Sequence, residues 1–140
     1  MIRVQDLLSA KPGGYWSIIP DAKVIEALRL MADKNVGALM VMKDGNLVGM
    51  LSERDYARKV ALMGKTPVDT PVSDIMASPA VTVTLEQTLE GCMTIMTEKR
   101  MRHLPVVDGG RVVGLLSIGD LVKAVIQEQQ ETIQRLYNRF

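Results

Sequence analysis

The sequence predicts a mixed α/β fold of the α+β kind, built from two β-α-β-β-α repeats and a long C-terminal helix. The sequence contains an internal repeat: residues 16–58 align with residues 81–123 at a constant offset of 65, with no gap and ten identities in 43 positions. The 140 residues, 47% hydrophobic, suffice for one compact domain. Since one such repeat cannot cover both faces of its small sheet, we expect the two to pack about a pseudo-twofold axis.

A shorter match precedes each repeat. Residues 4–8 resemble residues 72–76, but at an offset of 68, so the first repeat carries three extra loop residues within 11–16. We therefore divide the chain into four parts: a first repeat (4–64), a linker (65–71), a second repeat (72–126) and a C-terminal helical extension (127–140).

Each repeat begins with a short strand and a helix. In the second repeat the strand is expected at 81–83, and the apolar residues that follow recur at the spacing of a helix. In the first repeat the corresponding helix follows Asp21, a residue type that favours the N-cap position. We therefore expect Asp21 to cap that helix.

A hairpin and a second helix complete each repeat. Residues 43–46 and 108–110 contain Asp-Gly or Gly-Gly between apolar runs, which predicts tight turns. The helix after the first hairpin is expected from Asp55 to Met63, and the helix after the second from residue 119 or 120 to about Tyr137.

Charge and composition exclude several functions. The 17 Lys and Arg against 16 Asp and Glu give a net charge of +1, which provides no global field to attract nucleic acid. The densest basic run, Lys99 to His103, has no interleaved aromatic residues and is typical of a helix C-terminus. No membrane span and no secretion signal is recognisable, so we expect a cytoplasmic protein.

The pattern Gly-x-x-Ser-x-x-Asp ends both hairpins, at 49–55 and 114–120. In a structural interpretation, Ser52 with Asp55 and Ser117 with Asp120 are capping boxes. In a functional interpretation, amides at a helix start attract phosphate, and a carboxylate accepts hydrogen bonds from both hydroxyls of a ribose. The spacing leaves both interpretations open, and the second one describes a nucleotide site.

Taken together, these features resemble a tandem pair of cystathionine-β-synthase (CBS) domains, the Bateman module, as found in bacterial stand-alone CBS-domain proteins. The resemblance covers residues from about 4 to about 126. It rests on the doubled motif, on the linker that leads into 72–76, and on the runs 35–39, 52–58 and 102–107.

The resemblance implies a binder of adenine nucleotides (AMP, ATP or NAD(H)) in clefts between the repeats. It implies that Asp55 and Asp120 each hold a ribose and that Ser52 and Ser117 reach phosphate. The first-strand segments would offer backbone groups and apolar contacts to adenine, through Ser17, Ile18, Thr82 and Val83.

The resemblance also implies two unequal sites. Arg102 and His103 match positions that approach phosphates in related modules, whereas the first repeat has small residues there. We therefore expect the site of Asp120 to be the better phosphate site. Arg54 and Arg58 would assist phosphate binding at the other site or across a dimer.

Three further residues are singled out by their type. Trp16 either covers the core or a dimer interface, or it shapes the first site for a base or for the nicotinamide half of NAD(H). His103 either contacts phosphate or lies at a strand edge. Cys92 lies on the apolar stripe of its helix, and we expect it in the core.

The C-terminal stretch 121–140 retains apolar residues over a length that one small domain cannot cover, so we expect its tail to pack on a partner. CBS pairs commonly form dimers, which implies a homodimer here.

We therefore expect a non-enzymatic adenine-nucleotide sensor that passes a change of shape to an unidentified protein target. The alternative is a protein-interaction or dimerisation module whose Ser-x-x-Asp boxes are only helix caps. No combination of nucleophile, base and orienting group, and no set of metal ligands, can be assembled from these residues. We expect neither catalysis nor a metal site.

Overall fold

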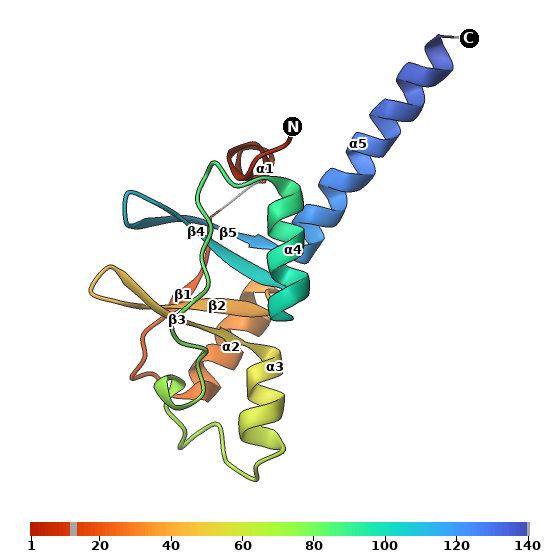
Figure 1. The fold of residues 1–140 in the computed structure, drawn as a ribbon. Coiled ribbons are helices and arrows are strands. Elements are labelled where there is room, and N and C mark those ends of the chain that lie inside the picture. The colour runs from red at the N-terminus through yellow and green to blue at the C-terminus, as the bar shows by residue number, and fades with distance from the viewer. Residues whose placement is uncertain (12–13, 140) are drawn as a thin grey trace. The chain divides into compact units, whose positions relative to one another are not determined.

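The computed structural model describes residues 1–11 and 14–139 (Figure 1). The chain forms two compact units. The first-repeat unit comprises Gly14–Val81 and Gly110–Val112, and the second-repeat unit comprises Met1–Gly13, Thr82–Gly109 and Val113–Phe140. Of the extra loop residues expected in the first repeat, Pro12 and Gly13 lie outside the described residues, as does Phe140.

The predicted repeat is confirmed by the boundaries of its elements, which also bear out the mixed α/β prediction. One helix and two strands of the first copy begin and end 65 residues before their counterparts in the second. The pairs are α2 (Val24–Lys34) with α4 (Leu89–Lys99), β2 (Ala38–Lys43) with β4 (His103–Asp108), and β3 (Asn46–Ser52) with β5 (Arg111–Ser117).

The first-repeat unit is built on a three-stranded sheet. Strand β1 (Ser17–Ile18) runs parallel to β2, which pairs antiparallel with β3, so the order is β1-β2-β3. Helix α2 buries Val24, Ala27 and Met31 in a core shared with residues of β2 and β3. The apolar positions predicted from helical spacing therefore face the sheet.

Asp21 does not cap α2, and that prediction is wrong. The helix begins at Val24, and its N-cap, Lys23, makes no side-chain cap. The carbonyl groups of the linker cap it instead, since Val24 N–H donates to the Thr70 carbonyl (2.9 Å) and Ile25 N–H to the Pro67 carbonyl (3.0 Å). Those acceptors are remote in sequence, so local propensity does not reveal them.

The helix after the first hairpin also differs from the prediction. An α-helical turn, α3 (Glu53–Tyr56), passes into a π-helical turn, η1 (Ala57–Ala61), instead of a regular helix to Met63. Val60 in this wider turn is fully buried, while Leu62 and Met63 are exposed. The segment thus contributes one anchor to the core.

Both hairpin turns have the predicted backbone geometry. Asp44 and Gly45 have φ of 52° and 80°, and Gly109 and Gly110 have φ of 57° and 79°. Two successive residues with positive φ give the turn whose twist matches paired strands. The predicted hairpins are confirmed.

The second-repeat unit contains the sheet β4-β5, helix α4, helix α5 (Ile118–Asn138) and the N-terminal helix α1 (Val4–Ala10). The start of α1 is fixed by backbone bonds. Val4 N–H donates to the Gln87 carbonyl (2.8 Å), and Leu89 N–H donates to the Ile2 carbonyl (2.9 Å). The N-terminal helix therefore packs with the second repeat, although it precedes the first in the chain.

The matching segment before the second repeat packs with the first one. The short 3-10 helix η2 (Val72–Asp74) buries Val72, and Ile75 after it is also buried in the core of the first-repeat unit. Met50 and Ala77 exchange backbone hydrogen bonds of 2.9 and 2.8 Å. Each unit is thus completed by the segment that precedes the other repeat.

The strand predicted at 81–83 is reduced to one residue. Val83 forms a parallel bridge to Val106, and its neighbours form no strand. By contrast, the long C-terminal helix is confirmed: α5 runs to Asn138, and Figure 1 shows its C-terminal half continuing beyond α1 and α4 of the same unit.

Candidate functional site

Both Ser-x-x-Asp motifs form complete capping boxes, which confirms the structural interpretation. Ser52 N–H donates to Asp55 Oδ2 (2.9 Å), and Asp55 N–H donates to Ser52 Oγ (3.2 Å). Ser117 N–H donates to Asp120 Oδ2 (2.8 Å), and Asp120 N–H donates to Ser117 Oγ (3.2 Å). The two motifs hold the first turns of α3 and α5 in the same way.

A second bond at each helix start comes from the residue just before the first strand of the hairpin. Glu53 N–H donates to the Gly37 carbonyl (3.0 Å), and Ile118 N–H donates to the Arg102 carbonyl (2.8 Å). Within the described part of the chain, the first-turn amides left without a hydrogen-bond acceptor are those of Arg54 and Gly119. Each helix start therefore offers one amide to an anion, which is fewer than the motif alone suggests.

The two serine hydroxyls differ. Ser52 Oγ donates to Asp55 Oδ2 (3.1 Å), so its proton is used within the box. Ser117 Oγ accepts from Asp120 and, among residues 1–11 and 14–139, donates to no group. The hydroxyl of Ser117 is therefore ready to donate to a ligand, whereas that of Ser52 must first leave Asp55.

A lysine neutralises each aspartate, and the sequence reasoning missed both lysines. Lys59 Nζ lies 3.3 Å from Asp55 Oδ1 and donates to the Ile75 carbonyl (3.0 Å). Lys11 Nζ donates to Asp120 Oδ2 (2.9 Å) and to the Leu115 carbonyl (2.6 Å). The i,i+4 spacing could have revealed Lys59, but Lys11 is 109 residues from its partner.

These contacts set the ionisation of Asp120. Burial alone would raise its pKa, but hydrogen bonds from the Ser117 backbone and from Lys11 outweigh burial, and the pKa is lowered. The side chain of Asp120 retains 20% of its exposure. A carboxylate that is charged, fixed and partly accessible can accept hydrogen bonds from hydroxyl groups.

Arg102 and His103 lie at the start of β4, where the Arg102 carbonyl holds the first amide of α5. Burial lowers the pKa of His103, the positive charges of Lys11 and Arg102 lower it further, and Asp120 opposes them. The structure therefore brings His103, Asp120 and Lys11 into one electrostatic neighbourhood within the second-repeat unit. At the same positions the first-repeat unit has no charged side chain, since Gly37 and Ala38 stand there.

The first-strand residues differ in what they can offer. Ser17 and Thr82 are exposed, and Ile18 packs partly against the core. The side chain of Val83 is only 4% exposed, and its N–H and carbonyl bond to Pro105 and Val107. In this region Thr82 is therefore more accessible to a ligand than Val83.

Trp16 lies on the surface and not in the core. It is 45% exposed, and Lys34 Nζ stands 4.5 Å from the centre of its ring, in the geometry of a cation–π contact. Arg54 and Arg58, on α3 and η1 of the same unit, are also exposed. Cys92 is fully buried as predicted, and burial raises the pKa of its thiol.

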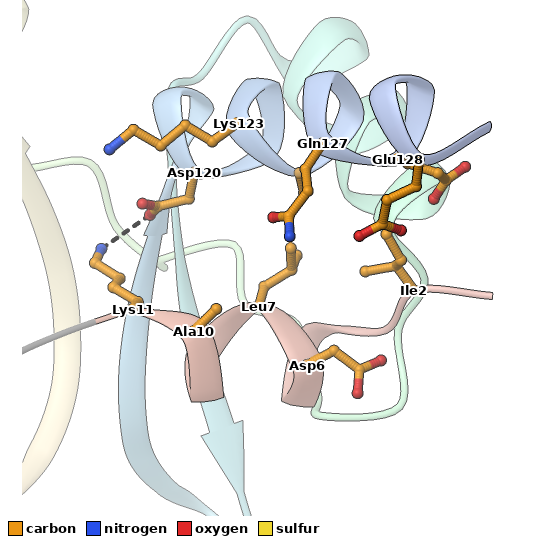
Figure 2. A pocket seen from close by; sticks show the side chains of 11 residues that line it. Ile2, Asp6, Leu7, Ala10, Lys11, Asp120, Lys123, Gln127 and Glu128 are labelled. Carbon is orange, nitrogen blue, oxygen red and sulfur yellow. Dashed lines mark hydrogen bonds and ion pairs between the residues drawn. The ribbon is translucent and has the colours of Figure 1, made fainter. Parts of the chain in front are cut away.

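A cavity of about 350 Å³ lies between α1 and the first half of α5 (Figure 2). The ion pair of Lys11 with Asp120 stands at one end, and Lys123 projects beside it. Leu7 and Gln127 face each other further along. Of the candidate ligand residues in the second-repeat unit, Asp120 lines the cavity together with Lys11, whereas Ser117, Arg102, His103, Thr82 and Val83 do not.

The described residues contain no group of three or more His, Cys, Asp or Glu side chains placed to hold a metal ion. None of their helices is both long and apolar enough to cross a membrane.

The chain is similar to known proteins along most of its length. The model of the CBS domain family matches residues 15–62 and 72–127. The mitochondrial CBS domain-containing protein CBSX3 of Arabidopsis thaliana is 38% identical over 142 residues, which cover 95% of this chain and 69% of CBSX3.

Solved structures agree with that similarity. The crystal structure of the CBS domain NE2398 matches with a TM-score of 0.84 and 51% identity, covering 89% of this chain and 97% of that one. A protein with CBS domains from Burkholderia ambifaria MC40-6, described as a candidate signal-transduction protein, matches with a TM-score of 0.86 and 45% identity, covering 91% and 96%.

Proposed function

The chain belongs to the CBS-domain family and carries two copies of the domain, and from this premise we propose that it is a non-enzymatic regulatory module that binds adenine nucleotides. One observation carries the proposal: each capping box presents a fixed aspartate that a lysine neutralises. A helix cap needs no such lysine. A site for a ribose and an adjacent phosphate can use both groups, because the carboxylate accepts from the ribose hydroxyls and a cation pairs with the phosphate.

The second-repeat unit has the stronger set of phosphate donors. We assign the ribose to Asp120 and the phosphate to Ser117, Arg102 and His103, with Thr82 toward the adenine. Val83 is left out of this assignment, because its side chain is buried and its N–H and carbonyl are bonded to Pro105 and Val107. The free hydroxyl of Ser117 and the nearby positive charges support this assignment. AMP is the smallest nucleotide that offers both a ribose and a phosphate to this set.

In the first-repeat unit we assign the ribose to Asp55 and the phosphate to Ser52, with Arg54 and Arg58 as helpers. Ser17, Ile18 and Trp16 would lie toward the base. The exposed ring of Trp16 supports binding of a second aromatic ring, which favours NAD(H) there.

The experiment is a thermal-shift series with AMP, ADP, ATP, NAD+ and NADH. A tight site raises stability by about 2.7 kcal/mol when the nucleotide is in hundredfold excess over its dissociation constant. No shift with any of the five would refute the proposal. Mass spectrometry of small molecules released by denaturing the purified protein then identifies the nucleotide carried from the cell.

We further propose that the protein acts as a homodimer. Four exposed apolar residues of helix α5 lie at successive spacings of four, seven and three, which keep them on one face of the helix, as in a seam between helices. This seam consists of Val122, Ile126, Ile133 and Leu136.

The seam also supports the alternative function, a dimerisation module that binds no nucleotide. A variant with both Asp55→Ala and Asp120→Ala separates the two. If it still binds the regulated partner in wild-type stoichiometry and no nucleotide accompanies the wild-type protein, the alternative holds. The cytoplasm remains the proposed compartment, which cell fractionation tests.

A further inference from the structure

Lys11 links the N-terminal helix to the candidate ribose carboxylate. It is the C-cap residue of α1, and its ammonium reaches both Asp120 Oδ2 (2.9 Å) and the Leu115 carbonyl (2.6 Å) (Figure 2). The Lys11 side chain is only 27% exposed. A lysine held by two acceptors is a fixed positive charge and not a mobile surface group.

The ammonium group of Lys11 retains one N–H donor that a ligand can use. A protonated lysine has three N–H donors, and the described residues accept from two of them. The Ser117 backbone and Lys11 both donate to Oδ2 of Asp120, and within residues 1–11 and 14–139 Oδ1 accepts no hydrogen bond. A ribose hydroxyl can therefore donate to Oδ1 while the ammonium of Lys11 faces the adjoining group of the same ligand.

The duplication does not explain this lysine. The counterpart of Lys59 in the second repeat is Ala124, and the counterpart of Lys11 before that repeat is Pro79. Each unit nevertheless places an ammonium on its aspartate and on one backbone carbonyl. The same arrangement is thus built twice from unrelated positions.

The two lysines are not equivalent. Lys59 is 47% exposed and lies 3.3 Å from Asp55, whereas Lys11 is more buried and closer to Asp120. Solvent screens a buried charge less, so Lys11 acts more strongly on a nearby anion. Around His103, the positive charges of Lys11 and Arg102 together exceed the single negative charge of Asp120. The cavity is also lined by Asp6, Glu128 and Glu131, so this excess of positive charge does not extend along its whole length.

We propose that Lys11 binds the phosphate of the nucleotide whose ribose Asp120 holds, and that it makes this site select nucleotides over nucleosides. The inference rests on the proposed function. Adenosine would use Asp120 but not Lys11, whereas AMP would use both. Lys11 thereby makes α1 part of the ligand site in the second-repeat unit.

The test is calorimetric titration of AMP and of adenosine into the wild-type protein and into Lys11→Met, Lys11→Arg and Lys59→Met variants. We expect Lys11→Met to weaken AMP about tenfold or more while changing adenosine little, since a charge-assisted hydrogen bond is lost. Lys11→Arg keeps the charge and should retain most of the preference for AMP. Lys59→Met is the matched control and should leave the stronger AMP site unchanged.

A salt series gives a second readout that a structural role would not move. AMP binding by the wild type should weaken as salt rises, and this dependence should be smaller in Lys11→Met. If Lys11→Met loses AMP and adenosine affinity equally, or loses neither, the role of Lys11 is overturned. The proposal that the protein binds nucleotides would not be affected by that result. If Lys11→Met does not fold, Lys11→Arg provides the test. Loss of the preference for AMP over adenosine in Lys11→Arg would then overturn the role of Lys11. A wild type that binds neither ligand would overturn the proposed function and this inference with it.

Discussion

Gly49 lies so close to Ala77 that a Cβ atom at residue 49 would stand 2.8 Å from the Ala77 carbonyl oxygen. The glycine of the second motif is also crowded, because a Cβ atom at Gly114 would stand 2.7 Å from a methyl carbon of Leu8. The glycine of Gly-x-x-Ser-x-x-Asp therefore leaves room for the segment that precedes the other repeat, which approaches with backbone at Gly49 and with a side chain at Gly114.

The neighbours of the two glycines predict different costs for the same substitution. Gly49→Ala meets backbone that Met50 holds through two hydrogen bonds, whereas Gly114→Ala meets the end of a flexible side chain. We expect Gly49→Ala to lose about 1–3 kcal/mol of unfolding free energy and Gly114→Ala to lose less. Urea denaturation measures both, and a larger loss in Gly114→Ala would contradict this packing account.

Ser117→Ala separates helix capping from ligand binding. Removing either cap hydroxyl should cost about 1 kcal/mol of unfolding free energy, so Ser52→Ala and Ser117→Ala should be similarly destabilised. Only the Ser117 hydroxyl is free to donate, so we expect a clear loss of AMP affinity in Ser117→Ala and a smaller one in Ser52→Ala. If both variants lose the same AMP affinity, the two serines act only as helix caps and the Ser117 hydroxyl has no separate role in binding.

His103 predicts how stability depends on pH. Its pKa in the folded chain lies below the ordinary value of 6.5, because burial and the charges of Lys11 and Arg102 disfavour the imidazolium more than Asp120 favours it. As pH falls through 6.5, the unfolded chain takes up the proton first, so the free energy of unfolding decreases. Above 6.5 this contribution is fully present.

Urea denaturation above and below pH 6.5 checks this expectation. The wild type should lose more stability on acidification than His103→Gln, in which the titrating group is absent. If both proteins lose the same unfolding free energy on acidification, His103 does not contribute to the pH dependence of stability.

The seam on α5 predicts a change of assembly state. Ile133→Glu places a charge in the apolar seam and should convert the dimer to a monomer in analytical ultracentrifugation, with the helical circular dichroism retained. Gln134→Glu adds the same charge away from the seam and should leave the dimer intact. An unchanged molecular mass for Ile133→Glu would remove α5 from the interface.

Sequence reasoning located what is local or repeated. The offset of 65 placed α4, β4 and β5 from their first-repeat counterparts, and the Ser-x-x-Asp spacing identified both capping boxes. The duplicated pattern also distinguished Arg102 and His103 from the small residues of the first repeat.

What sequence reasoning missed depends on contacts between remote segments. The carbonyl group of Thr70 supplies the first cap of α2, and no local pattern points to it. Lys11 likewise reaches Asp120 only because α1 packs with the second repeat. A capping box can be read from four consecutive residues, whereas the charge that completes a binding site cannot.

The most direct measurement is calorimetric titration of AMP into the wild-type protein, Asp120→Ala and Asp55→Ala. We predict that the wild type binds AMP and that Asp120→Ala loses far more of that affinity than Asp55→Ala. The second-repeat unit places a free serine hydroxyl and the positive charges of Lys11 and Arg102 near its aspartate, whereas the hydroxyl of Ser52 is already used. Equal losses would contradict the asymmetry of the two sites, and absence of binding by the wild type would contradict the nucleotide-binding account.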